Sequence, residues 1–273
     1  RLTQTIANER TAAFRGFHAR IEGDTEMNRI NKNTQNRYLR ETPLLDFSEP
    51  SIQALVEEHG WRALPEYDRI GAVYTFVRDK IRFGYNVGDA IPASRVLRDE
   101  YGQCNTKGIL LMALLRAVDI SCRTHGFAIN KKLQKGAMTG LVYRSAPIEI
   151  FHSWVEVWYD ARWVTLEGFI LDKTYLSALQ RRFSACRGVF CGYGVAVRDF
   201  RHPPIEWRGK DTFIQNEGIV RDFGVYDCPD DLFHAHQQLL SPIKAFLYCH
   251  LGRRFMNRNV QRIRRQTDHD KED

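Results

Sequence analysis

The feature that most constrains the fold is an apolar run behind a single cysteine, in YGQCNTKGILLMALLRAVDI at residues 101–120. The segment Thr106–Val118 is apolar almost all round a helical wheel, and a helix of this kind has to be buried on every side. Gly102 predicts a turn immediately before the cysteine. The sequence therefore predicts a central buried helix with Cys104 in its first turn.

A cysteine at the start of a helix has two interpretations. The free N–H groups and the dipole of a helix N-terminus favour a thiolate, and the same N–H groups can stabilise an oxyanion. A free cysteine is also a common small apolar residue of protein cores. The choice between a nucleophile and a packing residue depends on whether the chain supplies a base.

The segment that supplies a base is IEIFHSWVEVWYDARWVTLEGF, residues 148–169. Its alternation of apolar and polar residues predicts a β-hairpin with a turn at Asp160–Ala161. With a two-residue turn, Trp154 faces Glu167, and His152 is diagonal to Glu167 with Cβ atoms roughly 7 Å apart. A histidine and a carboxylate within reach of each other are what an activated thiol requires.

The two faces of the predicted hairpin differ in character. One face is apolar and suited to the core, with Val155, Val157, Val164 and Leu166. The other face carries the histidine, the glutamate and three tryptophans, Trp154, Trp158 and Trp163. The tryptophans are candidates for the walls of a substrate cleft, with core packing as the equal alternative.

Other residues compete for the two roles. His125 follows Cys122 closely on a predicted strand and is the main competitor of His152 as the base. Asp172 is a fallback acid, although the register places it beyond the hairpin. A dyad without any orienting acid is the remaining alternative.

The rest of the pattern predicts helices before the central helix and strands after it. The expected helices are Ser51–His59, Glu66–Phe83, Ala93–Glu100, Tyr175–Phe183 and most of Phe233–Ile263. Ser48 or Ser51 is the expected N-cap of the first of them. The expected strands besides the hairpin are Cys122–Asn130 and a short Leu141–Arg144, with exposed or loop-rich segments at 84–92, 131–140 and 184–233. This order predicts an α+β fold in which the central helix packs on an antiparallel sheet.

Three regions are expected along the 273 residues. Residues 1–42 read as an N-terminal helical extension, 43–185 as the core, and 186–273 as a loop-rich and helical region packed on it. Much of the net charge of +7 lies in the basic tail at residues 253–265. That tail predicts either a solvated helix end or a contact with an anionic partner such as nucleic acid or a membrane surface.

The ordered motifs resemble the transglutaminase-like superfamily over roughly residues 43–175. In chain order, the motifs are G-x-C, a buried helix ending in LLRAVDISCR, H-x-W-V-E-V, and W-V-x-L followed by an acid. Upstream of them, RIGAVYTFVRDKIRFGYN and PASRVLRDEYGQC are similar to the lead-in helices of that family. The resemblance implies a papain-like Cys-His-acid core of bacterial type, with Cys104 as nucleophile, His152 as base and Glu167 as acid. The family usually has Asp in a D-P-[ST] context, whereas this chain reads LEGF.

The activity that the resemblance implies is cysteine-dependent acyl transfer or hydrolysis on amide bonds of a peptide, protein or peptide-like substrate. The oxyanion would be stabilised by the backbone N–H of Cys104 and by the side chain of Gln103. Water as acceptor gives hydrolysis and an amine gives transamidation. A non-catalytic binding or scaffolding module that keeps the fold is the alternative, since Glu167 departs from the family. A nucleic-acid-binding protein is a third hypothesis that only the basic charge favours.

No cofactor or metal is expected. The loose cysteine and histidine groupings lack the paired spacing of a structural zinc site; they are Cys186 and Cys191 with His202, and Cys228 with His234 and His236. Calcium loops of the D-x-D-x-D-G type are absent from the sequence. The six cysteines lack the paired spacings of a disulfide-stapled fold and are expected to be mostly free thiols. With no signal peptide and no apolar run of about 18 residues, this predicts a cytoplasmic protein.

Overall fold

The computed structural model of the protein describes residues 37–236 and 252–265. The chain divides into two compact units, residues 1–40 and residues 41–273, and only residues 37–40 of the first are described. The predicted N-terminal extension therefore lies almost wholly outside the described residues, as does the middle of the predicted helical segment Phe233–Ile263. The boundary expected near residue 185 stays a prediction.

The described part of the second unit contains both helices and strands. The helices are α2 (Pro50–Glu58), α3 (Glu66–Lys80), α4 (Ala93–Asp99), α5 (Cys104–Ala117), α6 (Gly140–Ser145), α7 (Lys173–Arg182), α8 (Pro229–Ala235) and α10 (Arg253–Arg265). The strands are β1 (Arg82–Phe83), β2 (Tyr101–Gly102), β3 (Cys122–Asn130), β4 (Glu149–Tyr159), β5 (Arg162–Leu166), β6 (Phe190–Gly192), β7 (Val195–Val197) and β8 (Ile219–Tyr226). The α+β fold class is confirmed.

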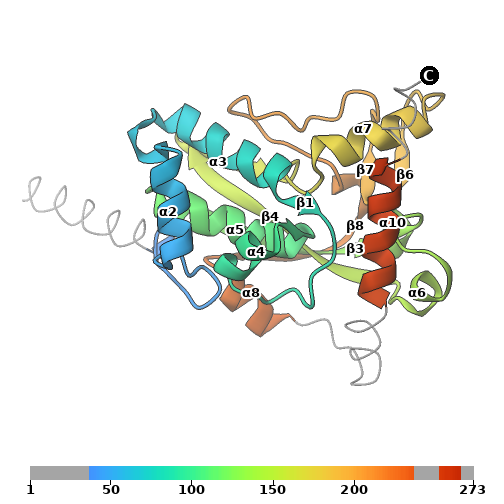
Figure 1. The fold of residues 1–273 in the computed structure, drawn as a ribbon, viewed down its shortest axis with the longest axis horizontal. Helices are drawn as coiled ribbons and strands as arrows, with labels where there is room; N and C mark the ends of the chain where they lie inside the picture. The colour runs from blue at the N-terminus through green and yellow to red at the C-terminus, as the bar shows by residue number, and fades with distance from the viewer. Residues whose placement is uncertain (1–36, 237–251, 266–273) are drawn as a thin grey trace, which may run out of the picture. The chain divides into compact units, whose positions relative to one another are not determined.

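Helix α5 is the centre of the core. Every one of its residues is buried, as the all-round apolar sequence predicts. It packs against α3 and α4 on one side and against β4 on the other (Figure 1). The helix begins at Cys104 itself, so the predicted place of the thiol in the first turn is confirmed.

The hairpin of β4 and β5 has the predicted register. Trp158 pairs with Trp163 and Val155 with Leu166, which leaves a loop of two residues. Those residues, Asp160 and Ala161, have φ values of 51° and 57°. Two positive φ angles give the turn whose twist matches that of paired strands. The predicted apolar face is buried against the core.

The main sheet contains one strand that the sequence analysis missed. Its order is β5-β4-β3-β8, with every neighbouring pair antiparallel. Strand β8 falls in the segment expected to be loop-rich, because its residues are mostly half-buried or exposed and show no alternation. Its pairing with β3 is also broken by irregularities at Gly126/Phe127 and Ala128/Ile129.

Several predicted elements are wrong in detail. The strand expected at Leu141–Arg144 is the short helix α6. The expected exposed loop after β3 begins with a 3-10 turn, Lys131–Gln134, whose Leu133 is fully buried. Neither Ser48 nor Ser51 caps α2; the N-cap is Glu49 and Pro50 occupies the first turn. These errors share a cause, since short segments carry too few residues for periodicity to separate helix from strand.

Gly102 has a different role from the predicted turn. It lies in β2, which pairs in parallel with β1. A Cβ atom at this position would lie 2.6 Å from Thr106 Oγ1 and 3.0 Å from Lys107 Cγ. A side chain of any size would therefore collide with the first turn of α5, and the glycine permits the strand to meet the helix at Cys104.

A buried lysine joins α5 to its neighbours. Lys107, one turn after the cysteine, is fully buried, and its Nζ donates to the carbonyl oxygens of Arg78 (3.1 Å) and Ile170 (3.0 Å). Burial lowers the pKa of Lys107 to about 7, and the negative charge of Asp172 opposes this shift. The amine thus connects the cysteine helix to α3 and to the segment after β5.

The basic tail packs against the core where it is described. Met256, Val260 and Ile263 of α10 are buried, and the helix lies alongside α7 (Figure 1). Arg264 forms a buried ion pair of 2.5 Å with Asp172 and also donates to the carbonyl of Phe83 at 2.8 Å. The expectation of a solvated helix end is therefore wrong for this helix, because its apolar face and one arginine are core residues.

The depressed pKa of Lys107 predicts a pH-dependent stability. Between pH 7 and about 10.5 the unfolded chain holds the lysine proton and the folded chain does not, so stability rises with pH by up to about 1.4 kcal/mol per unit. The variant Lys107→Met lacks this contribution. Urea unfolding of both proteins at pH 6 to 10 should show that the unfolding free energy of wild type increases relative to that of the variant as pH rises above 7. A constant difference would contradict a neutral buried lysine.

Candidate active site

Cys104 is the first residue of α5. The first backbone hydrogen bond of the helix runs from Lys107 N to Gln103 O at 2.9 Å, so the N–H groups of Cys104 and Asn105 have no helical acceptor. The cysteine is 7% exposed. Its side chain therefore lies in the positive end of the helix dipole at a narrow opening to solvent.

His152 and Glu167 form a fully buried pair. Nε2 of His152 lies 3.0 Å from Oε1 of Glu167, and both side chains have no exposed area. His152 lies on β4, past the end of its pairing with β5, and Glu167 directly follows β5. The structure thus brings together the two residues that the hairpin register predicted to be diagonal neighbours.

The second oxygen of Glu167 is held by the backbone. Oε2 accepts three N–H groups, from Ile214 (2.8 Å), Gln215 (2.9 Å) and Asn216 (3.1 Å). The backbone N–H of Glu167 donates to the hydroxyl and carbonyl oxygens of Thr212, both at 3.1 Å. These contacts fix the carboxylate and leave Oε1 for the histidine. The 212–216 segment lies far along the chain in a loop, and no pattern in the sequence points to it.

Cys104 dominates the forces that raise the pKa of His152. Burial alone would lower this pKa, but the proximity of Cys104 as a thiolate, followed by the interaction with Glu167, raises the pKa to about 10. Among the described residues Nδ1 has no hydrogen-bond partner in the resting arrangement. Because Nε2 is held by Glu167, Nδ1 is the nitrogen left for the sulfur. The arrangement suits an imidazolium beside a thiolate.

Gln103 and Asn105 flank the cysteine and are both buried. Gln103 Oε1 accepts from Asn86 N at 2.9 Å, and its Nε2 donates to Gly88 O (3.3 Å) and Asp89 Oδ1 (3.0 Å). The side-chain amide of Gln103 is thus directed at the 84–92 loop, and its predicted oxyanion role requires Nε2 to leave those acceptors. The backbone N–H of Cys104 has no such competing contact among the described residues.

The competing residues have other partners. Asp172 binds Arg264, accepts from Phe83 N at 2.8 Å and caps α7, so it is not the acid beside His152. His125 contacts Glu156 at 3.1 Å and Asp222 at 2.8 Å on the sheet. These contacts make Asp172 and His125 structural residues, and the fallback role considered for Asp172 does not fit its position.

The three tryptophans are spread along the hairpin. Trp158 and Trp163 pair edge to face at 5.3 Å near the turn, and Trp154 packs against Phe127 at 4.1 Å. Six strand residues separate Trp158 from His152, a distance of about 20 Å along the strand. Trp158 and Trp163 therefore lie too far to contact a group that reacts at the histidine, and only Trp154 remains close. The prediction considered the shared face but not the distance.

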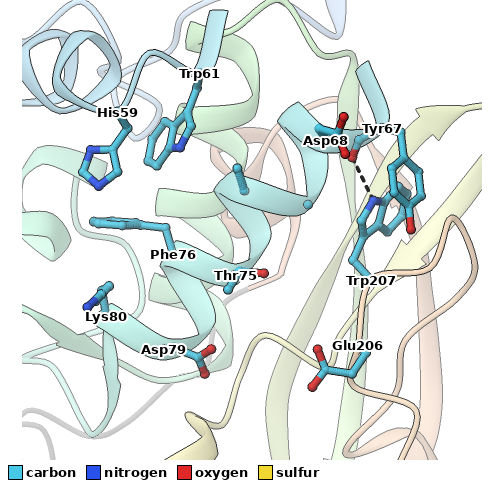
Figure 2. A pocket seen from close by; sticks show the side chains of 12 residues that line it. His59, Trp61, Tyr67, Asp68, Thr75, Phe76, Asp79, Lys80, Glu206 and Trp207 are labelled. Carbon is cyan, nitrogen blue, oxygen red and sulfur yellow. Dashed lines mark hydrogen bonds between the residues drawn. The ribbon is translucent and has the colours of Figure 1, made fainter. Parts of the chain in front are cut away.

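A separate hollow of about 750 Å³ lies over the outer face of α3 (Figure 2). Figure 2 shows His59, Trp61 and Phe76 on one side of it and Tyr67 and Trp207 on the other. Trp207 lies directly on Gly71, where a Cβ atom would be 2.7 Å from its ring. Neither the candidate triad nor the three hairpin tryptophans line this hollow.

The His, Cys, Asp and Glu side chains of residues 37–236 and 252–265 form no group of three that is suited to a metal ion. None of the helices in those ranges combines the length and the apolar character that crossing a membrane requires.

The family comparison agrees with the geometry. Residues 53–168 match the model of the transglutaminase-like superfamily, within the predicted core. This part of the chain is similar to the transglutaminase-like superfamily. The predicted resemblance is thereby confirmed, and the matched segment contains Cys104, His152 and Glu167. No curated protein matches the sequence.

One solved structure with partial similarity to this chain is that of a candidate cysteine protease from Cytophaga hutchinsonii. It is 13% identical, with a TM-score of 0.42, and the alignment covers 72% of this chain and 48% of that one. This chain thus spans about half the length of that protein. A likeness at this level bears on neither the fold nor the activity.

The two roles of the Glu167 carboxylate predict a large cost for its substitution. Glu167→Gln keeps one oxygen, so either His152 or the three backbone N–H groups lose an acceptor, and the variant should lose about 3 kcal/mol of unfolding free energy. Urea denaturation measures the loss, with Glu58→Gln on the exposed end of α2 as the control. A loss below about 0.5 kcal/mol, as expected for a surface position, would contradict this account.

Proposed function

We propose that the protein is a thiol hydrolase or acyltransferase acting on amide bonds, with Cys104, His152 and Glu167 as its catalytic triad. The observation that carries the proposal is the buried His152–Glu167 hydrogen bond, with the free Nδ1 of the ring left for the cysteine at the head of α5. The family match supports cysteine-dependent chemistry of this general kind.

The first step of the proposed reaction is attack by the Cys104 thiolate on the amide carbonyl. The negative charge that develops on the carbonyl oxygen lies near the N-terminus of α5, where the Cys104 N–H has no helical acceptor. The helix dipole favours the same charge. The central helix would thus serve both to hold the sulfur and to stabilise the tetrahedral intermediate.

The imidazolium of His152 then protonates the leaving amine through Nδ1, and the thioester of Cys104 remains. The neutral ring next removes a proton from water or from an incoming amine, and Glu167 keeps the ring in place throughout. Water releases an acid and an amine acceptor releases a new amide. The three residues are common to both outcomes.

Glutamate in place of the family aspartate suits this scaffold. The carboxylate reaches from the end of β5 to three N–H groups of the 214–216 segment and to the ring at the same time. Glu167→Asp, one methylene shorter, cannot span both sets without backbone movement. This argues for Glu167 as the acid rather than for a non-catalytic module with a degenerate site.

Selective alkylation of Cys104 tests the proposal. With iodoacetamide at pH 6, followed by mass mapping of each cysteine, Cys104 should react at least about tenfold faster than exposed Cys191, because His152 and the N-terminus of α5 would activate its sulfur. His152→Ala should abolish the advantage. If Cys104 reacts no faster than Cys191, the site is not a thiol active site and the binding-module alternative holds.

A further inference from the structure

Asp89 places a carboxylate beside the candidate nucleophile. It belongs to the 84–92 loop, and its Oδ1 accepts from Nε2 of Gln103 at 3.0 Å. The side chain of Asn105 hydrogen-bonds the same carboxyl group. Gln103 and Asn105 are the residues on either side of Cys104, so both contacts bring Asp89 to the head of α5.

Asn105 extends this contact to the strand of the histidine. Its Nδ2 donates to the carbonyl of Phe151 at 3.4 Å, and its Oδ1 accepts from the hydroxyl of Ser153 at 2.9 Å. Phe151 and Ser153 flank His152 as Gln103 and Asn105 flank Cys104. Asp89 therefore lies at the junction of the two elements that supply the sulfur and the imidazole.

This carboxyl group has amide partners but no cation among the described residues. The buried aspartate Asp172 is paired with Arg264, whereas no arginine, lysine or histidine of the described segments forms an ion pair with Asp89. Burial raises the pKa of Asp89, and the amides of Gln103 and Asn105 oppose the shift. Asp89 is nevertheless not fully buried, so a cation from solution can approach it.

We propose that Asp89 determines substrate preference at the Cys104 site by favouring a group with a positive charge, an ammonium or guanidinium, next to the reacting carbonyl. The inference rests on the proposed function and specifies its substrate class. A carboxylate partly withdrawn from water gains most from a cation that shares its environment. In a chain of net charge +7, a local negative site also steers cations to one place.

Asp89→Asn separates this role from a purely structural one. Asparagine has the same shape and keeps one oxygen to accept from Gln103, but it carries no charge. Asp119→Asn is the matched control, because it removes one exposed carboxylate beyond the other end of α5, about 20 Å away. Both variants change the net charge equally, so only a local effect distinguishes them.

Three methanethiosulfonates with different charges provide a test that needs no known substrate. They carry a trimethylammonium-ethyl, a sulfonatoethyl or a methyl group. In each case the cysteine thiolate attacks the sulfenyl sulfur, a disulfide forms and methanesulfinate leaves with the electron pair of the broken S–S bond. Rates at Cys104 are measured at low salt by mass mapping and divided by the rates at exposed Cys191 in the same sample.

In wild type the normalised cation-to-anion rate ratio at Cys104 should be about ten. It should fall at least fivefold in Asp89→Asn and stay unchanged in Asp119→Asn, while the rate with the neutral reagent stays the same in all three proteins. An unchanged ratio in Asp89→Asn overturns the inference. An equal fall with all three reagents overturns it too, because Asp89 would then only position Gln103.

The same measurements distinguish failure of the proposed function from failure of the role proposed for Asp89. If Cys104 has no advantage over Cys191 with the neutral methyl reagent or with iodoacetamide, the thiol active site itself fails, and the substrate preference fails with it. If Cys104 is selectively reactive but indifferent to reagent charge, only the role of Asp89 fails. Urea unfolding of Asp89→Asn confirms that the compared proteins are equally folded.

Discussion

The site depends on one buried carboxylate that is held from two directions. Glu167 Oε2 is fixed by three backbone N–H groups of residues 214–216, and Oε1 binds the ring of His152. A buried charge of this kind is tolerated only when its oxygens are fully hydrogen-bonded. The carboxylate orients the ring through Nε2 and leaves Nδ1 without a hydrogen-bond partner among the described residues.

The core is arranged to bring the sulfur to that nitrogen. Helix α5 is buried on all sides, which fixes its axis, and the parallel pairing of β1 with β2 fixes its start immediately before Cys104. Lys107 joins the helix to the segment that follows Glu167. Cys104 and Glu167, the proposed nucleophile and acid, are thus positioned by the same packed region, although they lie far apart in the sequence.

The predictable parts of this structure are those set by local periodicity and turn chemistry. The apolar run predicted α5, and the two-residue turn predicted the pairing that brings His152 to Glu167. Strand β8, the backbone cradle at residues 214–216 and the ion pair of Arg264 with Asp172 were not predictable. Each depends on a contact between distant segments for which the local sequence has no signature, and Trp158 shows that sharing a strand face does not imply proximity.

The central claim is that Cys104 and His152 form a thiolate–imidazolium pair. Nitrogen NMR of the His152 ring as a function of pH tests it most directly, since protonated and neutral imidazoles have distinct shifts. The account predicts that the ring is still charged at pH 8.5 in wild type, in line with a pKa of about 10, and neutral at that pH in Cys104→Ala. A ring that is already neutral at pH 8.5 in wild type, or that titrates identically in both proteins, would contradict the account.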